Sequence, residues 1–273
     1  FGSSRVGSVS SVRAIAARLA PRRSPPGSSG LAFAMKRPHP GNEGLLPKSG
    51  TKVYYWPATG KAQTIRLLLA DANVEWEDVV FETEMAVYSS QDSLPTIART
   101  DAYRKFCDAC REKGGNPTTN TPMLELDGKF YTQSHAIYKL VARKSGLYPA
   151  GADEAYVVDN ILAHVEDARQ PCYQVLRGGV DKETFLGTLL PNHLGNLERL
   201  LGDNDFFIAH SFSLADILVF DLLHNFYLAQ VPGACEKYPN LKRLYKSVGE
   251  RQHIKAYLES DKCKKINKFV KLE

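Results

Sequence analysis

The sequence contains no long apolar run. Among its 273 residues, no stretch approaches the roughly 18 uncharged apolar residues that a membrane-spanning helix requires. We therefore expect no membrane span. With 43% hydrophobic residues, the chain still has enough material for one or two buried cores.

Cysteines are few, and they are Cys107, Cys110, Cys172, Cys235 and Cys263. An odd number scattered through a chain of this length is typical of a reducing compartment rather than of a disulfide-linked domain. The first two form a Cys-x-x-Cys pair, but no second pair follows that would complete a zinc site. A redox pair would open the helix after the first strand, where residues 57–60 contain no cysteine. We therefore interpret Cys107 and Cys110 as thiols on a helix or loop, and we expect no metal site.

Acidic residues are almost absent from the first fifty positions. This segment carries eight Lys or Arg residues and a single acid, Glu43. It is rich in Ser, Gly, Pro and Arg, and such a composition cannot bury enough apolar surface to order itself. We predict a disordered or transit-like leader over residues 1–49. Two interpretations stay open: an organelle transit segment, or upstream sequence before a natural start at Met35, which would leave a cytoplasmic enzyme.

The net charge of +5 therefore comes from the leader. The remaining residues hold 27 basic and 29 acidic side chains, so this part of the chain is close to neutral. A nucleic-acid-binding basic face is not supported.

The segment from Thr121 to Ile137 is the most informative part of the chain. Asp127-Gly128 between alternating apolar residues is a strong signal for a two-residue β-hairpin. Pro122 enters the first strand, where an X-Pro bond is compatible with the cis form. Ser134 precedes an apolar helical run, which makes it the candidate N-cap of a helix whose free N–H groups suit a carboxylate. Taken alone, the segment could equally be a surface hairpin that leads into a helix.

The surrounding pattern places this hairpin in a small α/β unit. Residues 52–56 and 79–81 read as strands, 61–73 as an amphipathic helix, and 82–120 as a long polar connection. From Asp153 onward the chain is helical in character, with further helices expected near 182–201, 213–230, 239–248 and 253–258. We predict an α/β domain over residues 50–150 and an all-helical domain over 151–273.

Three segments give the chain a resemblance to a known family. They are residues 52–70, residues 121–148, and the Ser213–Ile217 motif with the later stretches 238–241 and 254–258. In this order they resemble the cytosolic glutathione transferases of the tyrosine type, most closely the sigma class. The resemblance implies a thioredoxin-like N-terminal domain followed by an all-α domain. Ser213 and Asp216 form a capping box, which stabilises the helical domain.

Tyr55 is the residue on which the implied chemistry depends. A thiol with an ordinary pKa near about 8.5 is mostly protonated at neutral pH, while the thiolate is the nucleophile. A hydroxyl that donates a hydrogen bond to the sulfur favours the charged form. In the family this tyrosine comes five residues before a glycine, and Tyr55 stands five before Gly60. Alternation along the strand sends Tyr54 to the opposite face.

The resemblance also implies the residues that hold glutathione. The backbone of Met123, beside Pro122, would pair with the cysteinyl amide, and Gln133 and Ser134 would hold the γ-glutamyl carboxylate. The remaining candidates are Lys61, which stands where these classes usually have arginine, Lys105 for the glycyl carboxylate, and Asp167 for glutathione in a partner subunit. An ordinary solvated helix face is the alternative for Asp167. His135, His164 and His193 are scattered singly and are interpreted as structural.

We therefore expect a cytoplasmic detoxification enzyme that joins glutathione, its co-substrate, to small electrophiles. It would be a homodimer without a cofactor, a nucleic-acid partner or a membrane partner. The alternatives are a non-catalytic scaffold or assembly subunit of the same fold, and a glutathione-dependent isomerase of the prostaglandin D synthase type. The electrophile is not readable from the sequence, and Tyr156, His164 and Tyr173 are only candidates for contacting it.

Overall fold

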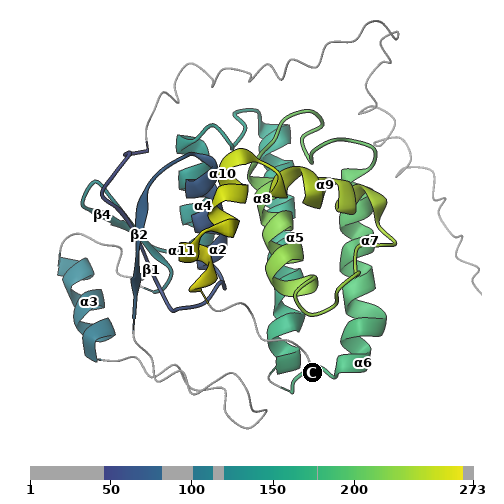
Figure 1. Cartoon of the computed structure of the whole chain (residues 1–273), viewed down its shortest axis with the longest axis horizontal. Helices are drawn as coiled ribbons and strands as arrows, with labels where there is room; N and C mark the ends of the chain where they lie inside the picture. The colour runs from purple at the N-terminus through teal and green to yellow at the C-terminus, as the bar shows by residue number, and fades with distance from the viewer. Residues whose placement is uncertain (1–45, 82–100, 113–119, 177, 267–273) are drawn as a thin grey trace, which may run out of the picture. The chain divides into compact units, whose positions relative to one another are not determined.

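A four-stranded sheet forms the first half of the folded chain (Figure 1). The structure is a computed structural model that describes residues 46–81, 101–112, 120–176 and 178–266, so the predicted leader lies outside the described residues apart from 46–49. The strands are β1 (Thr51–Tyr55), β2 (Trp76–Val80), β3 (Met123–Leu126) and β4 (Lys129–Tyr131), in the order β2-β1-β3-β4. β1 is parallel to β2 and antiparallel to β3, and β3 is antiparallel to β4. This is the predicted β-α-β unit followed by a hairpin.

Helix α2 (Ala62–Asp71) connects the two parallel strands and is buried from Ala62 to Ala70. It packs on β1 and on α4 (Ser134–Lys144) within the first half, and on α8 (Leu214–Asp221) of the second half. A helix enclosed in this way must satisfy its polar side chains internally. Arg66, only 1% exposed, donates from Nε to Asp78 Oδ1 at 2.7 Å. Asp78 lies within β2, which pairs with β1 from Trp76 onward and so begins three residues before the predicted Val79.

Helix α3 (Asp101–Glu112) lies within the stretch predicted as a polar connection. Its inner face joins an aromatic cluster, in which Phe106 stacks on Tyr54 with ring centroids 4.3 Å apart. Cys107 and Cys110 are buried in the same cluster as free thiols. The prediction missed this helix although Tyr103, Phe106, Cys107 and Cys110 follow helical spacing, because the segment as a whole is polar. The rest of the polar stretch, 82–100 and 113–119, lies outside the described residues.

The second half is helical, as predicted. Its elements are α5 (Ala152–Leu176), α6 (Lys182–Thr184), the π-helical turn η1 (Phe185–Leu189), α7 (Leu190–Leu201), α8, the π-helical turn η2 (Leu222–Tyr227), α9 (Pro239–Gly249), α10 (Gln252–Glu259) and α11 (Asp261–Lys264). The predicted capping box at the start of α8 is present: Ser213 N donates to Asp216 Oδ2 at 2.8 Å, and Ala215 N donates to Ser213 Oγ at 3.3 Å.

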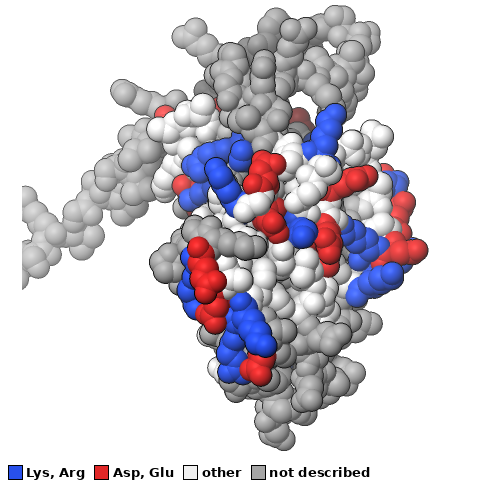
Figure 2. All heavy atoms as spheres, turned by 90° about the vertical axis from the view of Figure 1, so that its left-hand side faces the viewer, with Lys and Arg blue, Asp and Glu red and all other residues white. Residues whose placement is uncertain are grey.

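Two expectations about partners can be compared with the described residues. In this part of the chain, no helix combines the length and apolar character needed to cross a membrane. On the face shown in Figure 2, basic and acidic side chains are interspersed rather than segregated. This agrees with the near-neutral charge counted after residue 50.

Candidate functional site

The hydroxyl of Tyr55 lies against the turn that leads from β1 into α2. The backbone N–H of Lys61 donates to Tyr55 Oη at 3.2 Å. Gly60 permits this approach, because a Cβ built on it would lie 2.5 Å from the same oxygen and because its φ is +37°. An oxygen that accepts a hydrogen bond becomes a stronger donor through its own hydrogen. The arrangement can therefore present a polarised O–H to an anion.

Tyr54 is committed to a different role. Its hydroxyl donates to Glu125 Oε2 at 2.6 Å, on the side of the sheet covered by α3. Burial, followed by the hydrogen bond to Glu125, raises the pKa of Tyr54 well above its ordinary value. The alternation predicted for the two tyrosines is confirmed, and Tyr55 is the one that faces the start of α2.

An ionic cluster lies beside Tyr55. Lys61 Nζ and His135 Nε2 both contact Glu166 Oε2, at 2.8 and 2.9 Å. Burial alone would raise the pKa of Glu166, but the hydrogen bonds from His135 and Lys61 outweigh it and lower the pKa to about 2. Glu166 is therefore a carboxylate at neutral pH, and it links the start of α2, the start of α4 and the middle of α5.

A buried polar network of Thr64, Arg169 and Asp221 lies near this cluster and joins α2, α5 and α8. Arg169 on α5 and Asp221 on α8 are both fully buried and are joined by a 2.6 Å ion pair. Thr64 on α2 donates to Asp221 Oδ2 at 2.5 Å and accepts from Arg169 at 3.1 Å. Tyr138 on α4 donates to the carbonyl oxygen of Lys61 at 2.5 Å. The turn that carries the Lys61 N–H is thus held from several helices.

Pro122 precedes and Met123 begins β3, which lies between β1 and β4 in the sheet. The Thr121–Pro122 bond is cis, and Met123 pairs with Tyr54 in register. The ladder between β3 and β4 covers Leu124 to Leu126 and does not include Met123. The backbone of Met123 therefore extends beyond β4, where a short extended peptide could add to the sheet.

Gln133 and Ser134 begin α4, but their roles at the helix start differ from the prediction. Ser134 was predicted as the N-cap; the structure makes Gln133 the N-cap and Ser134 the first helical residue, with no side-chain cap bond from Gln133. Gln133 has φ +69°, a conformation that costs a non-glycine residue energy and is concentrated at functional sites. The sequence could not show this, because nothing in a Gln-Ser pair identifies a left-handed residue.

Other candidates are placed separately. Lys105 is exposed on α3, which packs on the Tyr54 side of the sheet. Asp167 is exposed on α5, directly after Glu166. Of the candidates for contacting the electrophile, Tyr173 is partly buried, and burial, followed by the Tyr55 side chain, raises its pKa. Tyr156 is 69% exposed. His164 lies against His193 and is not single as predicted.

Sequence reasoning missed Glu166, His135 and Tyr138 as parts of this site. Lys61 contacts Glu166 and Tyr138, which are 105 and 77 positions away, and His135 contacts Glu166, which is 31 positions away. Glu166 stands beside the predicted Asp167 and three residues before Arg169, but this spacing alone does not identify a partner for Lys61.

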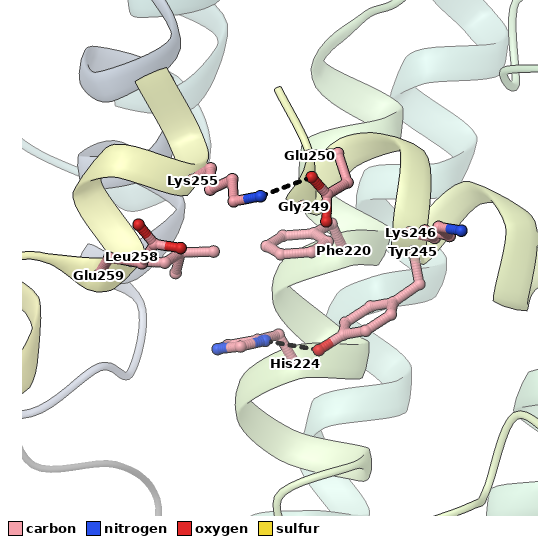
Figure 3. A pocket seen from close by; sticks show the side chains of 9 residues that line it. All are labelled: Phe220, His224, Tyr245, Lys246, Gly249, Glu250, Lys255, Leu258 and Glu259. Carbon is pink, nitrogen blue, oxygen red and sulfur yellow. Dashed lines mark hydrogen bonds and ion pairs between the residues drawn. The ribbon is translucent and has the colours of Figure 1, made fainter. Parts of the chain in front are cut away.

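A separate pocket of about 300 Å³ lies between α10 and the α8–η2–α9 segment (Figure 3). Its floor includes Phe220 and Tyr245, whose rings stack with centroids 5.2 Å apart, and His224 Nδ1 lies 2.8 Å from Tyr245 Oη. No predicted site residue lines this pocket. Among the described residues, no three His, Cys, Asp or Glu side chains group closely enough to form a metal site.

Comparisons with known proteins agree on one family. A model described as "Glutathione S-transferase, C-terminal domain" matches residues 166–261. "Glutathione S-transferase P 1" of Bufo bufo is 30% identical over 222 residues, covering 78% of this chain and 93% of that protein. "Glutathione S-transferase P 10" of Caenorhabditis elegans is 26% identical over 218 residues, covering 79% and 93%. The solved Pi-class glutathione S-transferase of Onchocerca volvulus superposes with a TM-score of 0.61 at 22% identity, covering 80% of this chain and 96% of that one.

Proposed function

This chain belongs to the glutathione S-transferase family, and on that premise we propose that it joins the thiolate of glutathione to an electrophilic carbon, with Tyr55 stabilising the anion. The thiol proton goes to solvent before the attack, the sulfur of glutathione forms the new bond to carbon, and a leaving group such as the chloride of a chloronitrobenzene departs with the electron pair of the broken bond. The relatives are named transferases, which favours conjugation over a non-catalytic scaffold or an isomerase.

The hydrogen bond from Lys61 N–H to Tyr55 Oη is the observation that carries the proposal. Because the oxygen of Tyr55 accepts from this N–H, we propose that its own hydrogen is donated to the sulfur of glutathione. A hydrogen bond to a charged partner contributes about 1.5–3 kcal/mol. At about 1.4 kcal/mol per pKa unit, this is enough to lower a thiol pKa by about one to two units.

The remaining glutathione contacts follow from the same geometry. The Met123 backbone, which extends beyond β4, supports strand-like pairing with the cysteinyl unit beside Pro122. The start of α4 supports a γ-glutamyl carboxylate at Gln133 and Ser134, because helix starts present free N–H groups. Lys61 contributes positive charge next to Tyr55, although its ammonium is already paired with Glu166. Lys105 for the glycyl carboxylate is the least supported, since α3 packs on the other side of the sheet.

The oligomeric state, class and location belong to the same proposal. We propose a homodimer in which Asp167, exposed on α5, reaches the partner's glutathione. We retain a tyrosine-type enzyme; the predicted closeness to the sigma class has less support, since relatives carry the P or Pi designation. A cytoplasmic location stays a prediction.

A matched pair of variants tests the function. Tyr55→Phe should lower kcat/KM for conjugation of a chloronitrobenzene substrate by about 10- to 100-fold, while glutathione-affinity retention persists. Tyr54→Phe, which removes the neighbouring hydroxyl on the other face, should leave kcat/KM within about twofold, because no transition-state contact is lost. Absence of glutathione binding, together with unchanged properties in Tyr55→Phe, would indicate the scaffold. Isomerised product from a prostaglandin endoperoxide would indicate the isomerase.

A further inference from the structure

The pocket between α10 and the α8–η2–α9 segment has an aromatic floor (Figure 3). The rings of Phe220, His224 and Tyr245 lie nearly parallel, with interplanar angles of 16°, 21° and 22° and centroids 5.2, 5.4 and 6.0 Å apart. His224 Nδ1 lies 2.8 Å from Tyr245 Oη, so a polar contact holds two of the rings together. Aromatic rings prefer offset stacking, so a floor of this kind favours a planar ligand.

Gly249 keeps the space beside this floor open. It is the last residue of α9, and its backbone has no positive φ that would require a glycine. Glycine is less favourable than alanine in a helix, so helix stability does not explain this residue. A Cβ built on Gly249 would lie 3.4 Å from Phe220 Cε2, and both residues line the pocket. The missing side chain therefore leaves room for a ligand next to the Phe220 ring.

The charged side chains around the pocket distinguish a cationic ligand from an anionic one. Lys255 Nζ donates to Glu250 Oε2 at 2.8 Å, and the pKa of Lys255 is raised by Glu250 first and by the charge of Glu259 to a lesser degree. Lys255 thus already serves two carboxylates, and Figure 3 shows Lys246 turned away from them. Glu259, one turn beyond Lys255 on α10, joins no ion pair within the described part of the chain. Its carboxylate is the charge that a ligand can neutralise.

We propose that this pocket binds a small aromatic amine in its protonated form. The planar ring of the ligand stacks on Phe220 and Tyr245 beside Gly249, and its ammonium group pairs with Glu259. The faces of the aromatic rings add an attraction for the cation. A volume of about 300 Å³ is at the lower end for small-molecule sites and suits a molecule of the size of an indole. No lining residue belongs to the proposed glutathione site, so the inference does not depend on conjugation.

The test is a calorimetric titration of the full chain with tryptamine near neutral pH, where its amine is protonated. We expect saturable binding of one molecule per chain, with a Kd on the order of 0.1–1 mM. Indoleacetate has a similar ring with a carboxylate in place of the ammonium, and it should bind about tenfold more weakly. Saturating S-hexylglutathione, a ligand for a conjugation site, should leave the tryptamine affinity within about twofold.

Gly249→Ala tests the shape of the pocket. Its new methyl group takes the space beside Phe220, so tryptamine and uncharged methylindole should both bind about tenfold more weakly. The unfolding free energy should stay the same or rise, because alanine favours the helix. Gly195→Ala is the matched control, since Gly195 is also a helical glycine without positive φ but lies on α7 outside the pocket. It should keep the tryptamine affinity within about twofold.

Glu259→Gln tests the charge at an exposed position, where the change leaves the fold intact. It should weaken tryptamine binding about threefold to fivefold and leave the methylindole affinity unchanged. Glu236→Gln, at an exposed glutamate that pairs with Lys242 outside the pocket, should change neither affinity. Four outcomes would overturn the proposal: no saturable binding, equal affinity for tryptamine and indoleacetate, unchanged affinity in both Gly249→Ala and Glu259→Gln, or displacement of tryptamine by S-hexylglutathione, which would assign the amine to the conjugation site.

Discussion

Gly60 should be as important for activity as Tyr55, although it carries no side chain. In Gly60→Ala the new Cβ would lie 2.5 Å from Tyr55 Oη and 3.0 Å from Cε1. Ordinary contacts between such atoms begin near about 3.5 Å, so the ring or the turn must move by on the order of 1 Å. Such a shift would break the 3.2 Å bond from Lys61 N–H to the hydroxyl.

A misplacement of about 1 Å in catalytic geometry can cost about 100-fold in rate. We therefore expect Gly60→Ala to lower kcat/KM for conjugation by about 100-fold, or about 2.7 kcal/mol in transition-state stabilisation. It should also lose about 1–2 kcal/mol of unfolding free energy, because alanine is strained at φ +37°. Steady-state kinetics and urea unfolding measure the two effects separately.

Gly128→Ala is the control that introduces backbone strain without a clash. It also has positive φ, +73°, but a Cβ there would meet nothing within 4 Å. Gly128→Ala should lose a similar unfolding free energy and keep its kcat/KM. A double-mutant cycle completes the test. In a Tyr55→Phe background the nearest clashing atom is gone, so adding Gly60→Ala should lower kcat/KM by less than about threefold relative to Tyr55→Phe alone. The reasoning would be refuted if Gly60→Ala lowered kcat/KM equally in the wild type and in Tyr55→Phe, or if Gly60→Ala alone kept near-normal activity.

Further predictions concern the residues around the site. Asp221→Ala should reduce the unfolding free energy by about 3–5 kcal/mol, because it leaves the buried charge of Arg169 unpaired. A loss below about 1 kcal/mol in urea unfolding would contradict a stabilising role of this ion pair. Glu166 has a folded pKa of about 2 against an ordinary 4.5. Its stabilisation is therefore present above pH 4.5 and is lost as the pH falls toward 2. The unfolding free energy of the wild type should exceed that of Glu166→Gln by about 3 kcal/mol near neutral pH, and this difference should shrink in acid. Urea unfolding at several pH values measures it, and a difference that does not change with pH would contradict the prediction. Tyr138→Phe should cost about 1 kcal/mol of unfolding free energy, for its lost bond to the carbonyl of Lys61; no measurable loss would show that this bond is not needed.

The parts of the fold that sequence predicted well are those fixed by local chemistry. Asp127 and Gly128 both adopt positive φ, as the hairpin signal requires, and the strands follow on either side. The Ser213–Asp216 capping box also formed as predicted, because all of its bonds join residues within three positions.

The parts that it missed depend on contacts between distant elements. Glu166 becomes the shared partner of Lys61 and His135 only when three helix segments meet. The pairing of His164 with His193 likewise depends on how α5 packs against α7. Helix α3 was missed although its apolar residues follow helical spacing, because what they pack on, the Tyr54 side of the sheet, is not visible in a polar segment of the sequence.

The central claim is that Tyr55 stabilises the thiolate of bound glutathione, and the most direct measurement is the pKa of that thiol. Ultraviolet absorbance of the thiolate, followed against pH in the binary complex, reports it for the wild type and for Tyr55→Phe. We predict that the pKa in the wild-type complex lies about one to two units below that in the Tyr55→Phe complex. Identical titration curves for the two complexes would contradict the account.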